Sequence, residues 1–197
     1  MSRYEIRIIG FGGQGVITLS KMIITAASLY EGLAGTQTEA YSAAARGGKC
    51  WAEVVIDLDS DKTQIDYPKA LPPYDFSIVL SKEGASDFKK KDLKEGKNTG
   101  FLLWDPSTIE KFRTAKRVKS LEIPVQKLSL ENYGDIVFGN TILFGVFTKI
   151  ANIFSNDSAI KTIKKFVPES TLETNLEAFE LGRQKGETFL KSLREEN

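Results

Sequence analysis

The spacing of apolar positions changes along the chain in a way that separates strands from helices. Short apolar runs bounded by turn residues predict buried strands, and apolar residues three or four positions apart predict helices. Strands are expected at residues 6–9, 34–40, 50–57, 76–80, 100–104 and 118–125. Helices are expected from residue 16 to residue 30 and at 84–93, 139–154, 158–166 and 172–193.

This order of elements predicts an α/β fold with a single layered domain over residues 1–197. Strands that alternate with helices are typical of a mostly parallel, Rossmann-like sheet flanked by helices, and here a helical C-terminal third follows it. Pro124 suits a sheet edge or a strand end, because proline cannot donate to a neighbouring strand. The segment 139–154 is apolar almost all round, so both its faces should be buried, either inside the domain or beneath another subunit.

Composition narrows the possible functions. The 27 Lys and Arg nearly cancel the 26 Asp and Glu, and the net charge of +1 provides no overall field for nucleic acid or an acidic membrane. One cysteine and no histidine exclude an intrachain disulfide, an Fe–S cluster, a zinc site and histidine-based catalysis. No catalytic residue and no metal ligand is therefore predicted. We expect a cytoplasmic protein, because no signal peptide or convincing membrane span is present.

The first strand runs into a glycine-rich turn, Gly10-Phe11-Gly12-Gly13-Gln14-Gly15, which opens the first helix. Glycine permits positive φ and close approach of a ligand, and the free amides at a helix N-terminus favour an anion. Glu39 follows at about the distance of a ribose-binding acid in a dinucleotide-binding fold. A nicotinamide cofactor and a purely structural tight turn are both compatible with this motif.

The residues around the turn carry a more specific signal. Residues 10–16 resemble the GxGGQGV signature that opens the γ domain of 2-oxoacid:ferredoxin oxidoreductases. The resemblance continues in order through three further elements: Thr38-Glu39-Ala40-Tyr41, Ala45-Arg46-Gly47-Gly48 with the strand 52–56, and Ile65-Asp66-Tyr67-Pro68. The last two look most like the 2-oxoglutarate branch. Residues 42–44 depart from the Gly-Pro-Glu that many relatives carry, although Arg46 remains.

The resemblance implies a γ subunit that is inactive alone. In such enzymes thiamine diphosphate with Mg²⁺ and Fe–S clusters belong to partner subunits, a 2-oxoacid is oxidatively decarboxylated, and the acyl group passes to coenzyme A. The implied partners are α, β and ferredoxin-like δ subunits, with ferredoxin or a similar acceptor. We also expect the isolated chain to associate with itself, because partner-facing apolar surface would be uncovered.

The candidate site residues are Gly12, Gly13, Gln14, Gly15 and Arg46, which would face an anionic group of coenzyme A or of a partner subunit. Arg46 lies among small residues and could instead form an internal salt bridge, and Gln14 could cap the turn. Glu39 and Glu53 could pair only if their strands are neighbours. A self-standing NAD-binding Rossmann oxidoreductase and a non-catalytic nucleotide-binding module remain the alternatives.

Overall fold

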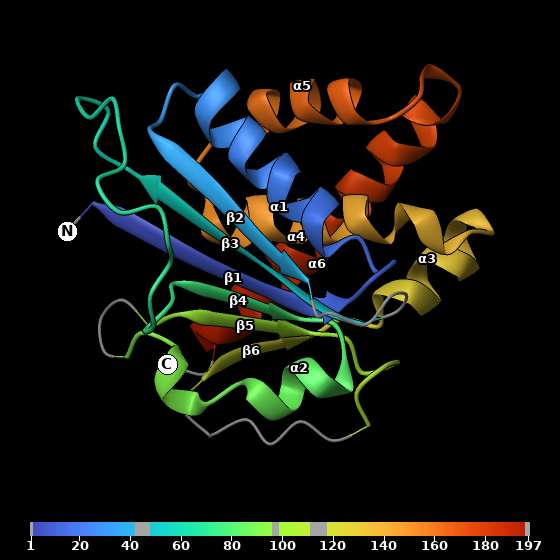
Figure 1. Cartoon of the computed structure of the whole chain (residues 1–197). Coiled ribbons are helices and arrows are strands. Elements are labelled where there is room, and N and C mark those ends of the chain that lie inside the picture. The colour runs from blue at the N-terminus through green and yellow to red at the C-terminus, as the bar shows by residue number, and fades with distance from the viewer. Residues whose placement is uncertain (1, 42–47, 96–98, 111–117, 196–197) are drawn as a thin grey trace.

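A mixed sheet with helices on both faces forms the protein. The computed structural model describes residues 2–41, 48–95, 99–110 and 118–195. Within these residues, six strands form one sheet in the order β2-β3-β1-β4-β5-β6 (Figure 1). The strands are β1 (Arg3–Phe11), β2 (Gly35–Tyr41), β3 (Lys49–Asp57), β4 (Phe76–Val79), β5 (Phe101–Trp104) and β6 (Lys119–Glu122).

The sheet is mostly parallel, as predicted. The pairs β1–β4, β4–β5 and β5–β6 are parallel, whereas β3 runs antiparallel to both β1 and β2. β2 therefore has the direction of β1 but is separated from it by β3. The expected βαβ opening thus occurs with an extra, reversed strand inserted between its two parallel strands. β6, next to Pro124, lies at the sheet edge as the proline indicated.

The helices are distributed unevenly between the two faces (Figure 1). Residues of α1, α4, α5 and α6 share one apolar core with the sheet face that includes Ile6 and Ile8. The opposite face is covered by α2, a smaller apolar cluster around Leu102 and the segment 58–75. The helices are α1 (Val16–Ile24), α2 (Lys82–Asp87), α3 (Val125–Tyr133), α4 (Gly139–Ala151), α5 (Asn156–Phe166) and α6 (Leu172–Glu195). Short helical segments are η1 (Thr25–Tyr30), η2 (Lys90–Asp92), η4 (Ile136–Phe138) and η5 (Glu169–Thr171).

α4 is buried within the chain itself, which resolves the alternative left open by its apolar sequence. Its main partner is α6, and two glycines allow the two backbones to approach closely. A Cβ added at Gly182 would overlap the carbonyl oxygen of Ile142, and one at Gly145 would overlap that of Phe179. Nearly every residue of α4 is buried by these contacts and by the sheet.

The structure differs from the expected elements in several places, of which three affect the helices. α3 was not predicted, because its sequence has little apolar character and the segment before it reads as extended up to Val125. The helix predicted at 84–93 is shorter: α2 ends at Asp87 and is followed by η2. α4 ends at Ala151, before the predicted 154, because Asn152 adopts the left-handed conformation with φ 50°.

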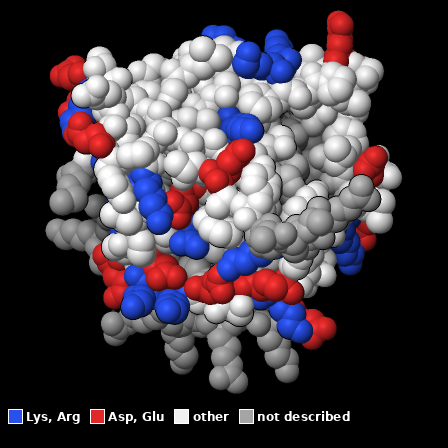
Figure 2. All heavy atoms as spheres, viewed as in Figure 1, with Lys and Arg blue, Asp and Glu red and all other residues white. Residues whose placement is uncertain are grey.

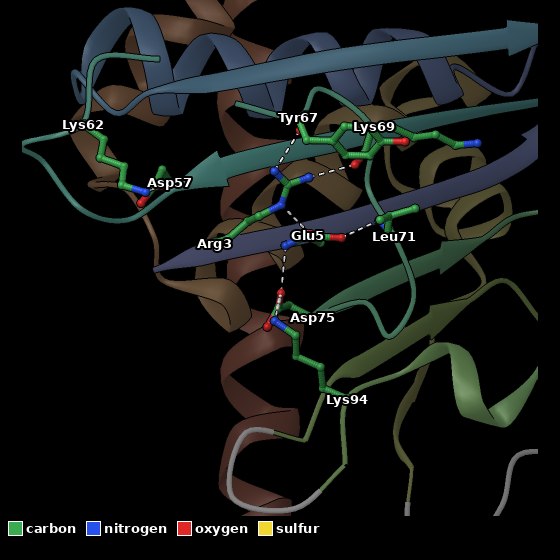
Figure 3. A network of polar contacts seen from close by, with 9 residues as sticks. All are labelled: Arg3, Glu5, Asp57, Lys62, Tyr67, Lys69, Leu71, Asp75 and Lys94. Carbon is green, nitrogen blue, oxygen red and sulfur yellow. Dashed lines mark hydrogen bonds and ion pairs between the residues drawn. The ribbon is translucent and has the colours of Figure 1, made fainter. Parts of the chain in front are cut away.

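The amino edge of the sheet is the end at which the parallel strands, such as β1, begin. There, the side chain of Arg3 binds the segment that follows β3 (Figure 3). Its guanidinium donates to the carbonyl oxygens of Tyr67 and Lys69, each at 2.8 Å. Its Nε donates to the carboxylate of Glu5 at 2.5 Å. The backbone of the Ile65-Asp66-Tyr67-Pro68 segment is therefore fixed by a charged side chain from β1.

Glu5 extends this network in two directions (Figure 3). Its carboxylate accepts from the backbone N–H of Leu71 at 2.5 Å, and its own N–H donates to Asp75 at 2.8 Å. Asp75 also pairs with Lys94 at 2.6 Å. Each charged side chain of this network has a partner of opposite charge within it: Arg3 binds Glu5, and Asp75 binds Lys94. The network therefore stabilises this end of the sheet.

Charged side chains are spread unevenly over the face shown in Figure 2. Lys, Arg, Asp and Glu gather in a band across its lower part, with both signs interspersed, and the upper part is mostly uncharged. This face therefore carries no large field of one sign, in agreement with the net charge of +1.

Candidate functional site

The carboxyl ends of β1, β4 and β5 meet at one edge of the sheet because these strands are parallel. From β1 the chain crosses through α1 to β2, whereas from β4 it passes through α2 to β5 on the other side of β1. In open α/β sheets, ligands bind in the crevice where neighbouring strands lead the chain in opposite directions. The glycine turn follows β1 at this point.

The side chain of Gln14 closes the glycine turn. Its Oε1 accepts a hydrogen bond from the N–H of Phe11 at 2.7 Å, and its Nε2 donates to the carbonyl oxygen of Leu80 at 2.8 Å. Backbone bonds from Gln14 to Phe11 (3.1 Å) and from Gly12 to Gly48 (3.0 Å) complete the turn. Gln14 therefore ties the end of β1 to the end of β4, which is the capping role weighed from the sequence.

Two glycines of the turn have conformations that other residues rarely adopt. Gly13 has φ 97° and Gly15 has φ 73°, both in the left-handed region. A Cβ at Gly15 would overlap the side-chain amide of Asn140, so the start of α4 lies directly against the turn. A Cβ at Gly13 would meet no atom within 4 Å, which leaves this backbone accessible.

A pocket of about 220 Å³ lies between the glycine turn and the helices that follow the sheet. The first residues of α3 and α4 line it together with the turn that starts α1, so the N-termini of three helices converge here. Helix N-termini carry unpaired amides and a partial positive charge. The pocket is lined by Gly13, Gln14, Leu80, Asp105, Val125, Gln126, Ile136, Val137, Gly139, Asn140 and Leu143.

Asp105 is a buried carboxylate on the pocket wall that sequence reasoning treated only as a strand end. It is 1% exposed and accepts hydrogen bonds from the backbone N–H of Ser107 at 2.8 Å, the Ser107 hydroxyl and the N–H of Gln126 at 3.4 Å. Its oxygens thus cap the turn after β5 and the start of α3. The feature of the sequence that could have pointed to Asp105 was its position, because it is a polar residue directly after a buried strand.

The candidate residue Arg46 lies outside the described residues. The residues that flank its loop do lie at the carboxyl edge, since Tyr41 pairs with Cys50 and Gly48 accepts from Gly12 at 3.0 Å. The described residue after this segment, Gly48, therefore contacts the glycine turn, whereas Tyr41 before it is one strand further away, across β3. Gly12, Gly13, Gln14 and Gly15 form the turn itself, and Gly13 and Gln14 line the pocket.

The sequence model of the pyruvate ferredoxin/flavodoxin oxidoreductase family matches residues 5–185. The chain belongs to this family. A 2-oxoglutarate synthase subunit KorC from Methanothermobacter thermautotrophicus is 41% identical over 187 residues, which cover 92% of this chain and 94% of that relative. A pyruvate synthase subunit PorC from Methanothermobacter marburgensis is 29% identical over 182 residues, 92% of this chain and 96% of the relative.

Solved structures of the oxidoreductase family share the fold. The γ subunit of a keto/oxoacid ferredoxin oxidoreductase from Geobacter sulfurreducens PCA superposes with a TM-score of 0.77 and 28% identity, over 94% of this chain and 99% of that one. A 2-oxoglutarate:ferredoxin oxidoreductase from Magnetococcus marinus, solved with 2-oxoglutarate, coenzyme A and succinyl-CoA bound, gives a TM-score of 0.76 at 22% identity. That match covers 95% of this chain but 32% of the longer Magnetococcus chain.

Glu39 is not placed for a dinucleotide ribose in this member of the oxidoreductase family. β3 separates β2 from β1 and its glycine turn. The Glu39 carboxylate accepts from the amide of Gln37 at 3.1 Å and pairs with Lys21 at 3.4 Å. These two partners lower the pKa of Glu39. Glu39, the residue that suggested a nicotinamide cofactor, therefore lies on an edge strand and binds Lys21 of α1.

Glu39 and Glu53 lie on neighbouring strands but on opposite faces of the sheet. Thr38 stands directly opposite Glu53 in the register, so the next residue, Glu39, points to the other face. Burial raises the pKa of Glu53, against the opposing charges of Arg7 at 3.7 Å and of Lys69. A carboxylate pair is thereby excluded for these two residues.

The described residues hold no ligand set for an Fe–S cluster or another metal centre. Cys50 is the sole cysteine in the sequence, and burial raises the pKa of its thiol. Among residues 2–41, 48–95, 99–110 and 118–195, no cluster of three or more acidic, histidine or cysteine side chains could hold a metal ion. In that same part of the chain, every helix is too short or too polar to cross a membrane.

Proposed function

We propose that this chain is the γ-type subunit, a single domain, of a 2-oxoglutarate:ferredoxin (or similar acceptor) oxidoreductase in the cytoplasm. The observation that carries the proposal is the higher identity to the 2-oxoglutarate synthase subunit than to the pyruvate synthase subunit, each over nine-tenths of the chain. The assembled enzyme would convert 2-oxoglutarate and coenzyme A to succinyl-CoA and CO₂. The two electrons released would pass to a low-potential acceptor.

The chemistry of the reaction would be supplied by α, β and ferredoxin-like δ subunits. Cluster ligation requires several thiolates, and one buried cysteine cannot provide them. Fe–S clusters are therefore assigned to the partners, and the resemblance to the oxidoreductase family assigns thiamine diphosphate and Mg²⁺ to them as well. The role of this chain is to complete the assembly and to contribute a surface at the reacting centre.

We assign that surface to the glycine turn and the loop that follows β2. Gly12, Gly13, Gln14 and Gly15 precede a helix whose amides favour an anion, and Arg46 would supply a positive charge from a loop that ends beside them at Gly48. The favoured anion is a phosphate of coenzyme A, with a carboxylate of a partner subunit as the alternative.

The size of the pocket limits how much of coenzyme A it accommodates. Sites that enclose drug-sized ligands span about 300–1,000 Å³, and the pocket beside the turn has about 220 Å³. One phosphate or the end of the pantetheine arm fits such a volume. The remainder of the molecule would be held by partner subunits, which agrees with a γ subunit that binds no cofactor alone.

Reconstitution tests the proposed function. The purified chain alone should not reduce a viologen dye with 2-oxoglutarate, whereas co-production with the neighbouring α, β and δ gene products should give activity that requires coenzyme A. 2-Oxoglutarate should be preferred over pyruvate in kcat/KM. Activity of the isolated chain, or an assembled complex that prefers pyruvate, would contradict the proposal.

Two matched pairs of variants test the site in the assembled enzyme. Gly13→Ala introduces a methyl group beside the pocket, and Gly32→Ala is its control, because Gly32 has a similar φ of 79° and also open space around its Cβ position.

Arg46→Ala removes the positive charge of the loop, and Arg194→Ala is its control, because Arg194 is exposed. Losing a charge-assisted contact of about 1.5–3 kcal/mol should raise KM for coenzyme A about ten- to a hundredfold, with KM for 2-oxoglutarate unchanged. Loss of assembly for Arg46→Ala would indicate a partner contact instead, and unchanged kinetics would refute both roles.

A further inference from the structure

The turn that follows α3 exposes aliphatic side chains that a monomer has no reason to keep in water. Ile136 and Val137 in η4 are 57% and 62% exposed, and Leu130 in α3 is 55% exposed. The backbone here is well fixed: Asp135 accepts from the N–H of Val137 at 3.0 Å, and Ser129 donates to the carbonyl oxygen of Asp135 at 2.5 Å. The exposure is therefore a property of an ordered surface.

The same turn forms a wall of the pocket. Ile136 and Val137 line it together with Gly13 and Gln14, so a protein that covered this turn would also cover part of the pocket wall. Two of the nearby charges, Lys127 and Glu131 on α3, pair with each other at 3.8 Å, and the exposed carboxylate of Asp135 stands directly before Ile136. A mostly apolar partner surface that offers a hydrogen-bond donor or a positive charge at its rim suits such a patch.

The longer relative indicates what the partner is. In the Magnetococcus enzyme this fold takes up 32% of one polypeptide, so its contacts with the rest of that polypeptide are made within a single chain. This chain matches the Geobacter γ subunit over 99% of that subunit's length. As the γ-type subunit proposed above, this chain would make the corresponding contacts with a separately encoded subunit.

We propose that Leu130, Ile136 and Val137 form the docking surface for the subunit that corresponds to the remainder of such longer chains, and that docking closes the pocket beside the glycine turn. This inference rests on the proposed function. Three of the other exposed apolar residues suit the role less well. Leu29 lies on η1 away from the pocket, and Tyr67 and Leu71 lie beside the self-contained ion-pair network at the amino edge.

The test measures the affinity of this chain for the subunit that corresponds to the remainder of the longer relatives, called here the co-encoded subunit. The two proteins are purified separately. The Ile136→Asp/Val137→Asp double variant should raise Kd about tenfold or more, since two desolvated aliphatic contacts are lost. Leu29→Asp is the control, because Leu29 is 59% exposed and lies elsewhere, and its Kd should stay within about twofold of wild type. Thermal melting checks that all three chains fold.

The outcomes separate the two proposals. If the wild-type chain does not bind the co-encoded subunit, the proposed function fails. If it binds and the double variant binds as well as Leu29→Asp, the docking surface is wrong while the function stands. A photo-crosslinker at Val137 provides a second readout: a covalent link to the partner supports the surface, and a link only to another copy of this chain overturns it.

Discussion

The two edges of the sheet use their polar groups in opposite ways. At the amino edge, Arg3, Glu5 and Asp75 bind one another and their immediate neighbours (Figure 3). At the carboxyl edge, glycines and the starts of three helices surround a pocket, and Asp105 is the buried charge on its wall. Charged groups that bind one another stabilise a fold, whereas the first amides of α1 and α4 have no side-chain cap. The comparison therefore associates the amino edge with stability, and recognition of a ligand at the carboxyl edge is the proposal that the variants below test.

Gly15→Ala should have the largest effect and tests the construction of the carboxyl edge. An alanine at φ 73° is strained by about 1–2 kcal/mol, and its Cβ would overlap the Asn140 amide, which adds about 1–3 kcal/mol of overpacking. Urea unfolding should show a loss of about 3 kcal/mol or more. Gly32→Ala carries similar strain without the overlap, so it should lose only about 1–2 kcal/mol. Equal losses for the two variants would mean that the contact with α4 is unimportant.

Arg3→Met should have the next largest effect and tests the amino edge. The variant removes two bonds to carbonyl oxygens and the bond to Glu5, and we expect unfolding free energy to fall by about 1–2 kcal/mol after allowance for solvent exposure. Arg183→Ala is the control, since it breaks only an exposed pair with Glu180 and should cost less than about 0.5 kcal/mol. KM for coenzyme A in the assembled enzyme should not change. A rise in this KM would show that the amino edge also affects coenzyme A binding, and it would contradict the separate roles of the two edges.

Asp57→Asn should have the smallest effect, and its pH dependence sharpens the comparison. A hydrogen bond from Ser2, with help from the N–H of Asp59 and from Lys62, lowers the pKa of Asp57 in the folded chain. Because the folded pKa lies below the unfolded one, the stabilisation is present above the unfolded value of about 3.9 and is lost as pH falls through the folded value.

The stability difference between wild type and Asp57→Asn should therefore be about 1 kcal/mol near neutral pH and shrink in acid. Chemical denaturation at several pH values measures it. The exposed variant Asp157→Asn, whose partner Lys161 is also exposed, serves as the reference. A difference that is constant down to pH 3 would show that the charge of Asp57 is not involved.

The sequence predicted the strong local patterns and failed where several segments meet. The glycine turn, the strands and α4 followed from composition and periodicity alone. The reversal of β3 did not, because strand direction is decided by pairings between residues far apart in the sequence. α3 was missed since its apolar residues are few. The pocket joins Gln14, Asp105 and Asn140, which no local motif connects. The sequence offered capping of the turn as one role of Gln14, but its second partner, the carbonyl oxygen of Leu80, is 66 residues away and could not be predicted.

The reversed strand also has a consequence for how the chain is made. β1 is synthesised first, yet its two neighbours are β3 and β4, and β4 ends only at Val79. At about 5–20 residues per second, a ribosome needs on the order of several seconds to deliver that partner. Until then the apolar strand Arg3–Phe11 can pair only with β3, which is complete at Asp57, and its other side has no neighbour. Nascent chains should therefore expose one side of β1 to chaperones until β4 has been made.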